Sequence, residues 1–194
     1  LVRFGRWEEV LREPEPPAGL PFTRAVWHYA RGMAFAAQGR LDQAETERNR
    51  LLAAAESLPD GLHVSLNEAA KVLRIADKVL AGEAAARRGD YDKGIGLLKE
   101  AVRLEDGLQY NEPPGWYYPV RHSLGAVLLA AGRSAEAEAI YRADLKRNPE
   151  NGWALMGLAQ SLRARQATQE AEIVEARFRQ AWACAEVSLT ASRF

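Results

Sequence analysis

The chain has 194 residues, with 26 basic and 26 acidic side chains and a formal net charge of zero. This balance argues against a nucleic-acid-binding protein, which normally presents a basic stripe to the phosphates. The single cysteine, Cys184, excludes an intrachain disulfide and favours a reducing compartment, so we expect a cytoplasmic protein. No apolar run approaches the roughly 18 residues that a membrane-spanning helix needs.

Apolar residues recur at helical spacing along the whole chain, and this predicts an all-α protein. The first stretch, "RFGRWEEVL", predicts the second helix of a truncated helical hairpin within residues 1–14, with Gly5 at the turn and Val10 at a packed position. The first helix of that hairpin would lie before Leu1. We therefore expect this chain to be the C-terminal part of a longer protein, whose uncovered apolar helix face here favours self-association.

Two further hairpins are expected over residues 22–58 and 65–108. The insertion between them contains a turn at residues 59–61. Ser65 with Glu68 forms a capping box that predicts a helix start at this point. Its expected apolar face consists of Leu66, Ala69, Leu73, Ala76 and Leu80. Asp90 is the expected N-cap of the second helix in this hairpin.

Residues 109–117 are expected to form a connection, because Glu112 precedes a proline and is disfavoured in a helix. A third hairpin follows over residues 118–150. Asn148 and Pro149 predict the N-cap and first residue of the next helix. Residues 151–189 contain a divergent last copy and a long closing helix over 169–187, followed by a loose tail.

A glycine pattern recurs in three of these segments. Each has a glycine, a second glycine seven residues later and a small residue five further on. The triplets are Gly32, Gly39, Ala44; Gly82, Gly89, Gly94; and Gly125, Gly132, Ala137. The first glycine allows two helices to approach closely, and the second ends a helix in a left-handed conformation. A fourth copy starts at Trp153 and Gly157 but has Ala164 at the turn position and a two-residue slip before Ala171.

This pattern resembles the tetratricopeptide repeat family of bacterial type, whose repeats have about 34 residues in two helices. The third copy carries the likeness best, at Leu124, Gly125, Leu128, Gly132, Ala137, Tyr141 and Pro149. The resemblance implies a right-handed α-solenoid with irregular long helices and a C-terminal capping helix. It also implies a non-enzymatic scaffold that binds a peptide or partner protein on the concave surface lined by each first helix.

Carrying over the family's groove positions gives a mostly apolar set: Tyr29, Met33, Glu83, Arg87, His122, Asn151 and Leu158, with Val26, Val79, Ala126, Leu129 and Ser161 beside them. The set lacks the lysines and asparagines of the family's carboxylate clamp. Either an apolar peptide binds in this groove, or the closing helix fills it.

The segment "NEPPGWYYPVRHS" offers an alternative site. Aromatic faces with one charge are suited to an apolar or cationic ligand, and the candidate pocket is Tyr110, Glu112, Trp116, Tyr117 and Arg121. Packing of these aromatics between neighbouring helices is the plainer interpretation of the same residues.

No catalytic constellation is recognisable, and we expect neither an enzyme, a cofactor nor a metal site. His28, His63 and His122 are too widely separated to resemble a metal-ligand motif. His122 and Ser123 are sequence neighbours that cannot face each other on a helix. Cys184 lies in an apolar helical stretch, where a thiol is normally inert packing.

Overall fold

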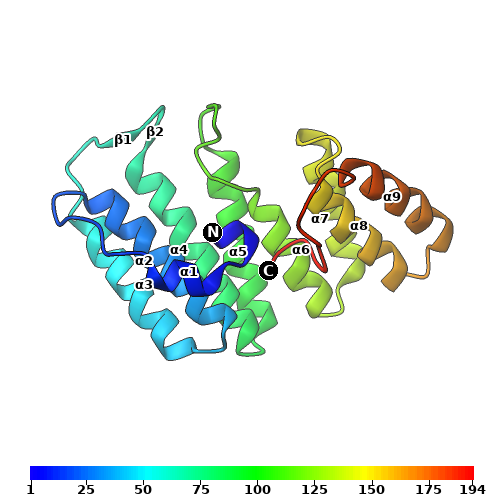
Figure 1. Cartoon of the computed structure of the whole chain (residues 1–194), viewed down its shortest axis with the longest axis horizontal. Helices are drawn as coiled ribbons and strands as arrows, with labels where there is room; N and C mark the ends of the chain where they lie inside the picture. Colours follow the sequence, from blue (N-terminus) through cyan, green and yellow to red (C-terminus); the bar gives the residue numbers. More distant parts are fainter. The chain divides into compact units, whose positions relative to one another are not determined.

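The computed structural model describes residues 1–194 and contains nine α-helices, one short 3-10 helix and a single two-stranded β-hairpin (Figure 1). The predicted all-α fold class is therefore confirmed. No helix combines the length and the apolar character required to cross a membrane. The chain divides into two compact units, Leu1–Val120 and Arg121–Phe194, which are described in turn.

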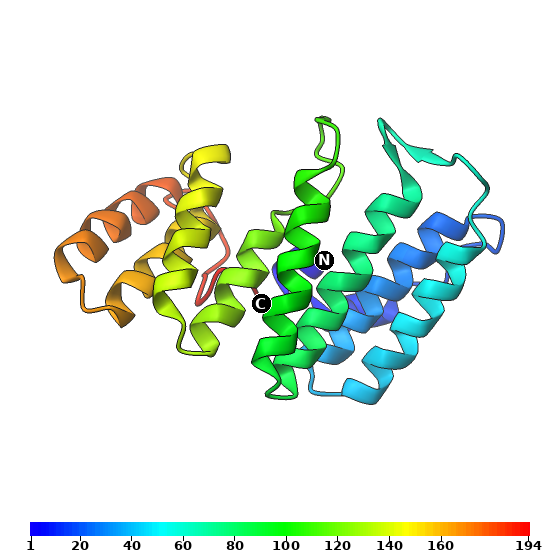
Figure 2. The same ribbon diagram turned by 180° about the vertical axis from the view of Figure 1, so that it is seen from behind.

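The first unit contains two long helical hairpins. Its elements are η1 (Val2–Phe4), α1 (Trp7–Arg12), α2 (Pro21–Ala37), α3 (Leu41–Glu56), β1 (His63–Val64), β2 (Asn67–Glu68), α4 (Ala69–Arg87) and α5 (Tyr91–Asp106). Helix α4 packs against α2 and α3 as well as its own partner α5, so the two hairpins share one core, and the four helices lie side by side in Figures 1 and 2.

The glycine pattern has the predicted roles in this unit. Gly39 and Gly89 have φ angles of +74° and +87°, so each closes its hairpin in a left-handed conformation that favours glycine. Gly32 lies against Leu80, and a Cβ added at this glycine would be 2.5 Å from Leu80 Cδ2. Asp90 caps α5, because its side chain accepts a hydrogen bond from the Lys93 amide at 3.2 Å. The close contact between α2 and α4 at Gly32 therefore depends on the absence of a side chain there.

The start of α4 differs from the prediction. Ser65, with φ 54°, lies with Leu66 in the turn of the β-hairpin, and the helix begins only at Ala69, without a side-chain cap. Leu66 is consequently 56% exposed and does not belong to the apolar face. The two strands of this insertion pair through their backbone groups. The side chain of Asn67 also holds the backbone of Gln109: its Oδ1 accepts from the Gln109 amide at 2.8 Å, and its Nδ2 donates to the Gln109 carbonyl at 3.1 Å.

The second unit has helices α6 (Val120–Ala130, whose first residue still belongs to the first unit), α7 (Ser134–Arg147), α8 (Gly152–Ala164) and α9 (Thr168–Ala181). The ring of Tyr141 on α7 is fully buried and lies against both Gly125 of α6 and Gly157 of α8. An added Cβ would be 2.3 Å from that ring at Gly125 and 2.1 Å at Gly157. These two glycines make the room that the tyrosine fills.

Helix α8 begins later than Asn148 and Pro149 predict. Its N-cap is Asn151, whose side chain accepts hydrogen bonds from the amides of Trp153 (3.0 Å) and Ala154 (3.4 Å). Glu150, with φ 57°, redirects the chain just before this cap. Of the two asparagines in this segment, Asn148 and Asn151, the second caps the helix.

The predicted slip in the last copy is present. The left-handed residue that follows α8 is Gln166, with φ 62°, two positions after Ala164. Ala171 lies five residues further on and is fully buried, which restores the spacing of the other copies.

The C-terminal tail is packed, contrary to prediction, and α9 ends at Ala181 instead of continuing to residue 187. Ser192 Oγ donates a hydrogen bond to the His122 carbonyl at 2.9 Å and lies 2.6 Å from the Tyr141 hydroxyl. Phe194 meets the Trp153 ring edge-on at 5.5 Å. Cys184 lies beyond the end of α9 and is exposed, so it does not pack in a helix.

Candidate functional site

Tyr29, near the middle of α2, is the centre of an aromatic group in the first unit. Its ring makes edge-on contacts with Trp116 at 5.4 Å and Tyr117 at 6.4 Å, and its hydroxyl lies 3.1 Å from that of Tyr117. Tyr118 adjoins the Tyr117 ring at 4.6 Å. We call Tyr29, Trp116, Tyr117 and Tyr118 the Tyr29 aromatic cluster. It unites one residue of the predicted groove with two of the alternative pocket.

Three segments of the chain position this cluster. The aromatic segment 116–118 is held to α5, because the Val120 amide donates to Glu105 Oε2 at 3.0 Å. From the chain start, the Arg3 guanidinium lies 5.8 Å from the centre of the Tyr118 ring, and η1 contacts α2. Residues far apart in sequence therefore cover the face of α2 that carries Tyr29.

The cluster has a buried base and an exposed rim. Tyr29 is 2% exposed and Trp116 6%, whereas Tyr117 is 44% exposed. Two apolar residues beside the cluster in sequence are also exposed: Val26, one helical turn before Tyr29, and Phe4, next to Arg3. Burial raises the pKa of Tyr29 well above its ordinary value, and the neighbouring phenols add to this shift. Its hydroxyl therefore stays protonated and can donate a hydrogen bond at neutral pH.

The other predicted groove residues lie mostly in the interiors of their units. In the first unit Met33, Val79 and Glu83 are buried, whereas Val26 and Arg87 are exposed. The second unit contains the remaining positions: His122, Leu158 and Ser161 are buried, while Ala126, Leu129 and Asn151 are half-buried.

The alternative pocket is not assembled as one group within the first unit. Tyr110 is 81% exposed and hydrogen-bonds through its hydroxyl to the Glu112 carboxylate, out on the loop. Trp116 and Tyr117 instead join the Tyr29 aromatic cluster. Arg121 belongs to the second unit and is half-buried.

His122 and His63 each lie within hydrogen-bond distance of a neighbouring group. His122 Nε2 lies 3.1 Å from Asp144 Oδ2 in the interior of the second unit, and Asn148 Nδ2 donates to the other oxygen of Asp144 at 3.1 Å. His63 is exposed in β1, with Nδ1 2.7 Å from the Gly61 carbonyl. No group of three or more His, Cys, Asp or Glu side chains is placed to hold a metal ion.

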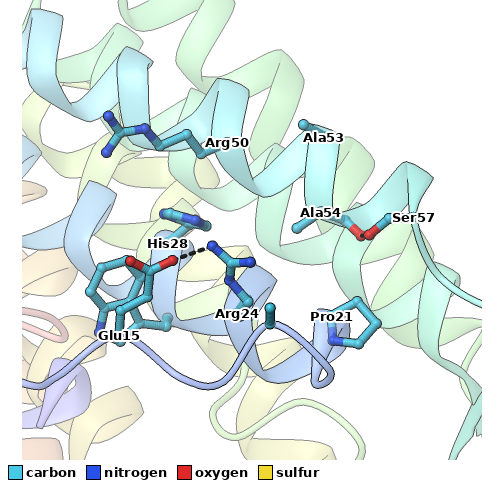
Figure 3. A pocket seen from close by; sticks show the side chains of 10 residues that line it. Glu15, Pro21, Arg24, His28, Arg50, Ala53, Ala54 and Ser57 are labelled. Carbon is cyan, nitrogen blue, oxygen red and sulfur yellow. Dashed lines mark hydrogen bonds and ion pairs between the residues drawn. The ribbon is translucent and has the colours of Figure 1, made fainter.

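A cavity of about 510 Å³ in the first unit was missed by sequence reasoning (Figure 3). Its walls come from the loop before α2, from α2 and from α3: Glu15, Ala18, Pro21, Arg24, Trp27, His28, Arg50, Ala53, Ala54 and Ser57. These residues spread over more than forty positions. Their charged members resemble ordinary helix-surface residues, so no local signal marks them.

Comparison with protein families gives a match to the tetratricopeptide repeat at two places, residues 26–49 and 119–143. The first match covers most of α2 and half of α3, and the second covers α6 and most of α7. Both fall on hairpins that carry the glycine pattern. Comparisons with curated proteins and with solved structures found no match.

Proposed function

Because this chain is a tetratricopeptide-repeat protein, and such repeats generally mediate protein–protein interaction, we propose that it is a non-enzymatic scaffold that binds a segment of a partner protein. The proposed contact surface in the first unit is the exposed rim of the Tyr29 aromatic cluster, formed by Tyr117 with Val26 and Phe4.

The observation that carries this proposal is the half-exposed ring of Tyr117 on a buried aromatic base. Tyrosine and tryptophan supply much of the binding energy in protein interfaces, because a rigid ring buries a large area at little cost in side-chain entropy. Tyr117 is already oriented by its contacts with Tyr29 and Trp116. A partner therefore meets a preorganised surface.

The burial of the groove residues determines how deeply a partner reaches. Met33 and Glu83 lie in the interior beneath their helix faces, so we expect an apolar or aromatic side chain of the partner to rest on the rim. Arg87 is exposed at the end of α4, in the other long hairpin of this unit.

The test is a matched pair of substitutions, Tyr117→Ala and Tyr110→Ala. Partners captured on the wild-type chain would be identified by mass spectrometry, purified and titrated by calorimetry against each variant. We expect Tyr117→Ala to weaken binding about tenfold or more, the usual effect of losing an interface aromatic. Tyr110→Ala removes an equally large but separate ring, and it should leave the affinity within about twofold.

Tyr117→Phe separates the ring from its hydroxyl and should retain most of the affinity, because the contact area is kept. Equal losses in the two alanine variants would refute the proposed surface. Absence of any saturable partner for the wild-type chain would count against the scaffold itself.

A further inference from the structure

The cavity of the first unit lies on a different face of α2 from the Tyr29 aromatic cluster. Arg24, Trp27 and His28 recur at the three- to four-residue spacing of one helix face, whereas Val26 and Tyr29 belong to another. Figure 3 shows Glu15 and Pro21 on the loop side of the cavity, with Arg50, Ala53 and Ala54 of α3, and Ser57 just after this helix, opposite.

The loop over this cavity, residues 13–20, is anchored from α2. Trp27 Nε1 donates to the Glu13 carbonyl at 3.1 Å, and Arg31 Nη1 donates to the Leu11 carbonyl, also at 3.1 Å. Three of the loop residues are prolines, which restrict its backbone. The loop therefore holds Glu15 at the cavity with a limited range of movement.

The wall behind His28 is electrostatically compensated. The buried Glu47 carboxylate lies 2.7 Å from His28 Nδ1 and accepts hydrogen bonds from Arg31 and Arg50, each at 3.3 Å. Because Nδ1 is engaged, Nε2 is the ring nitrogen of His28 left for a ligand. The other charged residues that line the cavity are Arg24 and Glu15, and Arg50 adds a second guanidinium to the cavity while it also binds Glu47.

Arg24 has unused hydrogen-bonding capacity. Its Nη2 donates to Glu15 Oε1, but its Nε is buried and has no hydrogen-bond partner. The N–H groups of Nε and Nη2 lie on one edge of the guanidinium, where one carboxylate can bind both. Arg163 uses this edge fully: its Nε donates to Glu175 Oε1 and its Nη2 to Glu175 Oε2, each at 2.8 Å. Glu15 satisfies only half of the same edge on Arg24.

We propose that this cavity is a binding site for the carboxylate of an acidic peptide segment, and that Glu15 holds the place of that carboxylate in the unbound chain. The incoming carboxylate binds Nε and Nη2 of Arg24 together, with Arg50 and His28 Nε2 nearby. Its aliphatic stem packs on the apolar wall formed by Pro21, Ala53 and Ala54.

Exchange of Glu15 for the ligand is energetically easy. The side chain of Glu15 is 51% exposed and that of Arg24 is 33% exposed, and ion pairs with this exposure contribute little to stability. The ligand gains the second hydrogen bond that Glu15 does not make. The volume of about 510 Å³ is in the range of ligand pockets.

The experiment uses the whole chain and a fluorescein-labelled peptide of four glutamates, with binding followed by fluorescence anisotropy at low salt. Glu15→Gln should tighten binding about threefold to tenfold, because it removes the internal competitor. Arg24→Gln should weaken binding more than about tenfold. Arg74→Gln, which removes an exposed arginine of α4, should stay within about twofold of the wild type.

A site-specific measurement accompanies the affinities. The Nε–Hε resonance of Arg24, assigned by its loss in Arg24→Gln, should shift with the glutamate peptide and not with a peptide of four glutamines. The opposite effects of the two cavity variants separate this prediction from a folding defect, which would not strengthen binding.

Competition by unlabelled probes identifies the source of the anion. If inorganic phosphate displaces the peptide and the dicarboxylate succinate does not, the carboxylate assignment is overturned. Succinate that binds far more tightly than the peptide would overturn the peptide assignment. Unchanged affinity in Glu15→Gln, or equal binding of the glutamine peptide, would overturn the proposal as a whole. None of these results depends on the Tyr117 surface, so the two proposals fail separately.

Discussion

Tyr141 joins two hairpins of the second unit at the level of single side chains. Its ring occupies space left by Gly125 on one side and Gly157 on the other, and it has no exposed surface. A methyl group added at either glycine would meet a ring that has no open space into which to move. The two glycines and the tyrosine therefore form one packing unit.

Gly125→Ala should lower the free energy of unfolding of the second unit by about 1–3 kcal/mol, because the new methyl group overpacks the Tyr141 ring. Gly96→Ala is the control. Gly96 lies in the middle of α5 with no atom within 4 Å of an added Cβ, so alanine there should stabilise by about 0.5–1 kcal/mol. Urea unfolding followed by circular dichroism measures both changes, and a stabilised Gly125→Ala variant would disprove the packing argument.

These residue-scale roles are the part of the fold that could be predicted from the sequence. A left-handed turn and a close helix contact each impose a steric demand on one position, so Gly39, Gly89 and Gly32 are recognisable by residue type alone. Caps are less certain. Ser65 and Asn148 both have the right chemistry, but hairpin formation and the nearby Asn151 decide where the helices begin.

At the scale of elements, the C-terminal tail contributes to the second unit through hydrogen bonds as well as apolar packing. Ser192 connects the Tyr141 hydroxyl with the His122 carbonyl, and Gln160 Nε2 donates to the Thr190 carbonyl at 2.7 Å. Leu189 is buried beside these contacts. The tail therefore covers surface that the shorter α9 leaves open.

Ser192→Ala should lower the free energy of unfolding of the second unit by about 1–3 kcal/mol, since it removes the hydrogen-bond partner of the buried Tyr141 hydroxyl. Ser188→Ala, at an exposed position in the same tail, should change it by less than about 0.5 kcal/mol. Hydrogen exchange at the first turns of α6 gives an independent measure. Equal stability of the two variants would show that the tail is not held by this contact.

The tail and the β-hairpin could not be predicted because neither has a strong periodic pattern. "SLTASRF" has the composition of a disordered end, and its order depends on surfaces of α6, α7 and α8 that only the folded unit presents. Residues 63–68 pair as strands although a capping-box pattern favours a helix there. In both segments tertiary contacts determine the local conformation.

At the scale of the whole molecule, each unit has a fully or almost fully buried tyrosine whose pKa is raised, Tyr29 in the first and Tyr141 in the second. Burial raises the pKa of Tyr29 well above its ordinary value in the first unit, and burial also raises that of Tyr141 in the second. Unfolding exposes both phenols and returns their pKa values to about 10. Above that pH the folded state retains protons that the unfolded state has lost.

The free energy of unfolding should therefore be independent of these groups below about pH 10 and should fall as the pH rises above it. Urea unfolding at pH values from 8 to 11 measures the trend. Tyr29→Phe should reduce the alkaline loss in the first unit, whereas Tyr91→Phe, which alters an exposed ring, should not. An alkaline loss that persists unchanged in Tyr29→Phe would assign it to other groups.

The candidate sites were only partly predictable for a related reason. Helical spacing places Tyr29 and Met33 on one face, but spacing does not reveal that residues 116–118 cover that face. The packing interpretation of "GWYY" and the groove interpretation of Tyr29 describe one cluster. The cavity at Arg24 gave no signal, because its charged residues lie in three separate segments and look like solvated surface.

Gln166 adopts the left-handed conformation that glycine adopts between the other paired helices. Its φ angle of 62° is in the same left-handed region as the 73° of Gly132, although the residue type differs and the turn comes two places later than in the other copies. The family match falls on two hairpins, and the α4–α5 and α8–α9 helix pairs lie outside it. A left-handed residue between paired helices is therefore kept in this chain even where the side chain is not glycine.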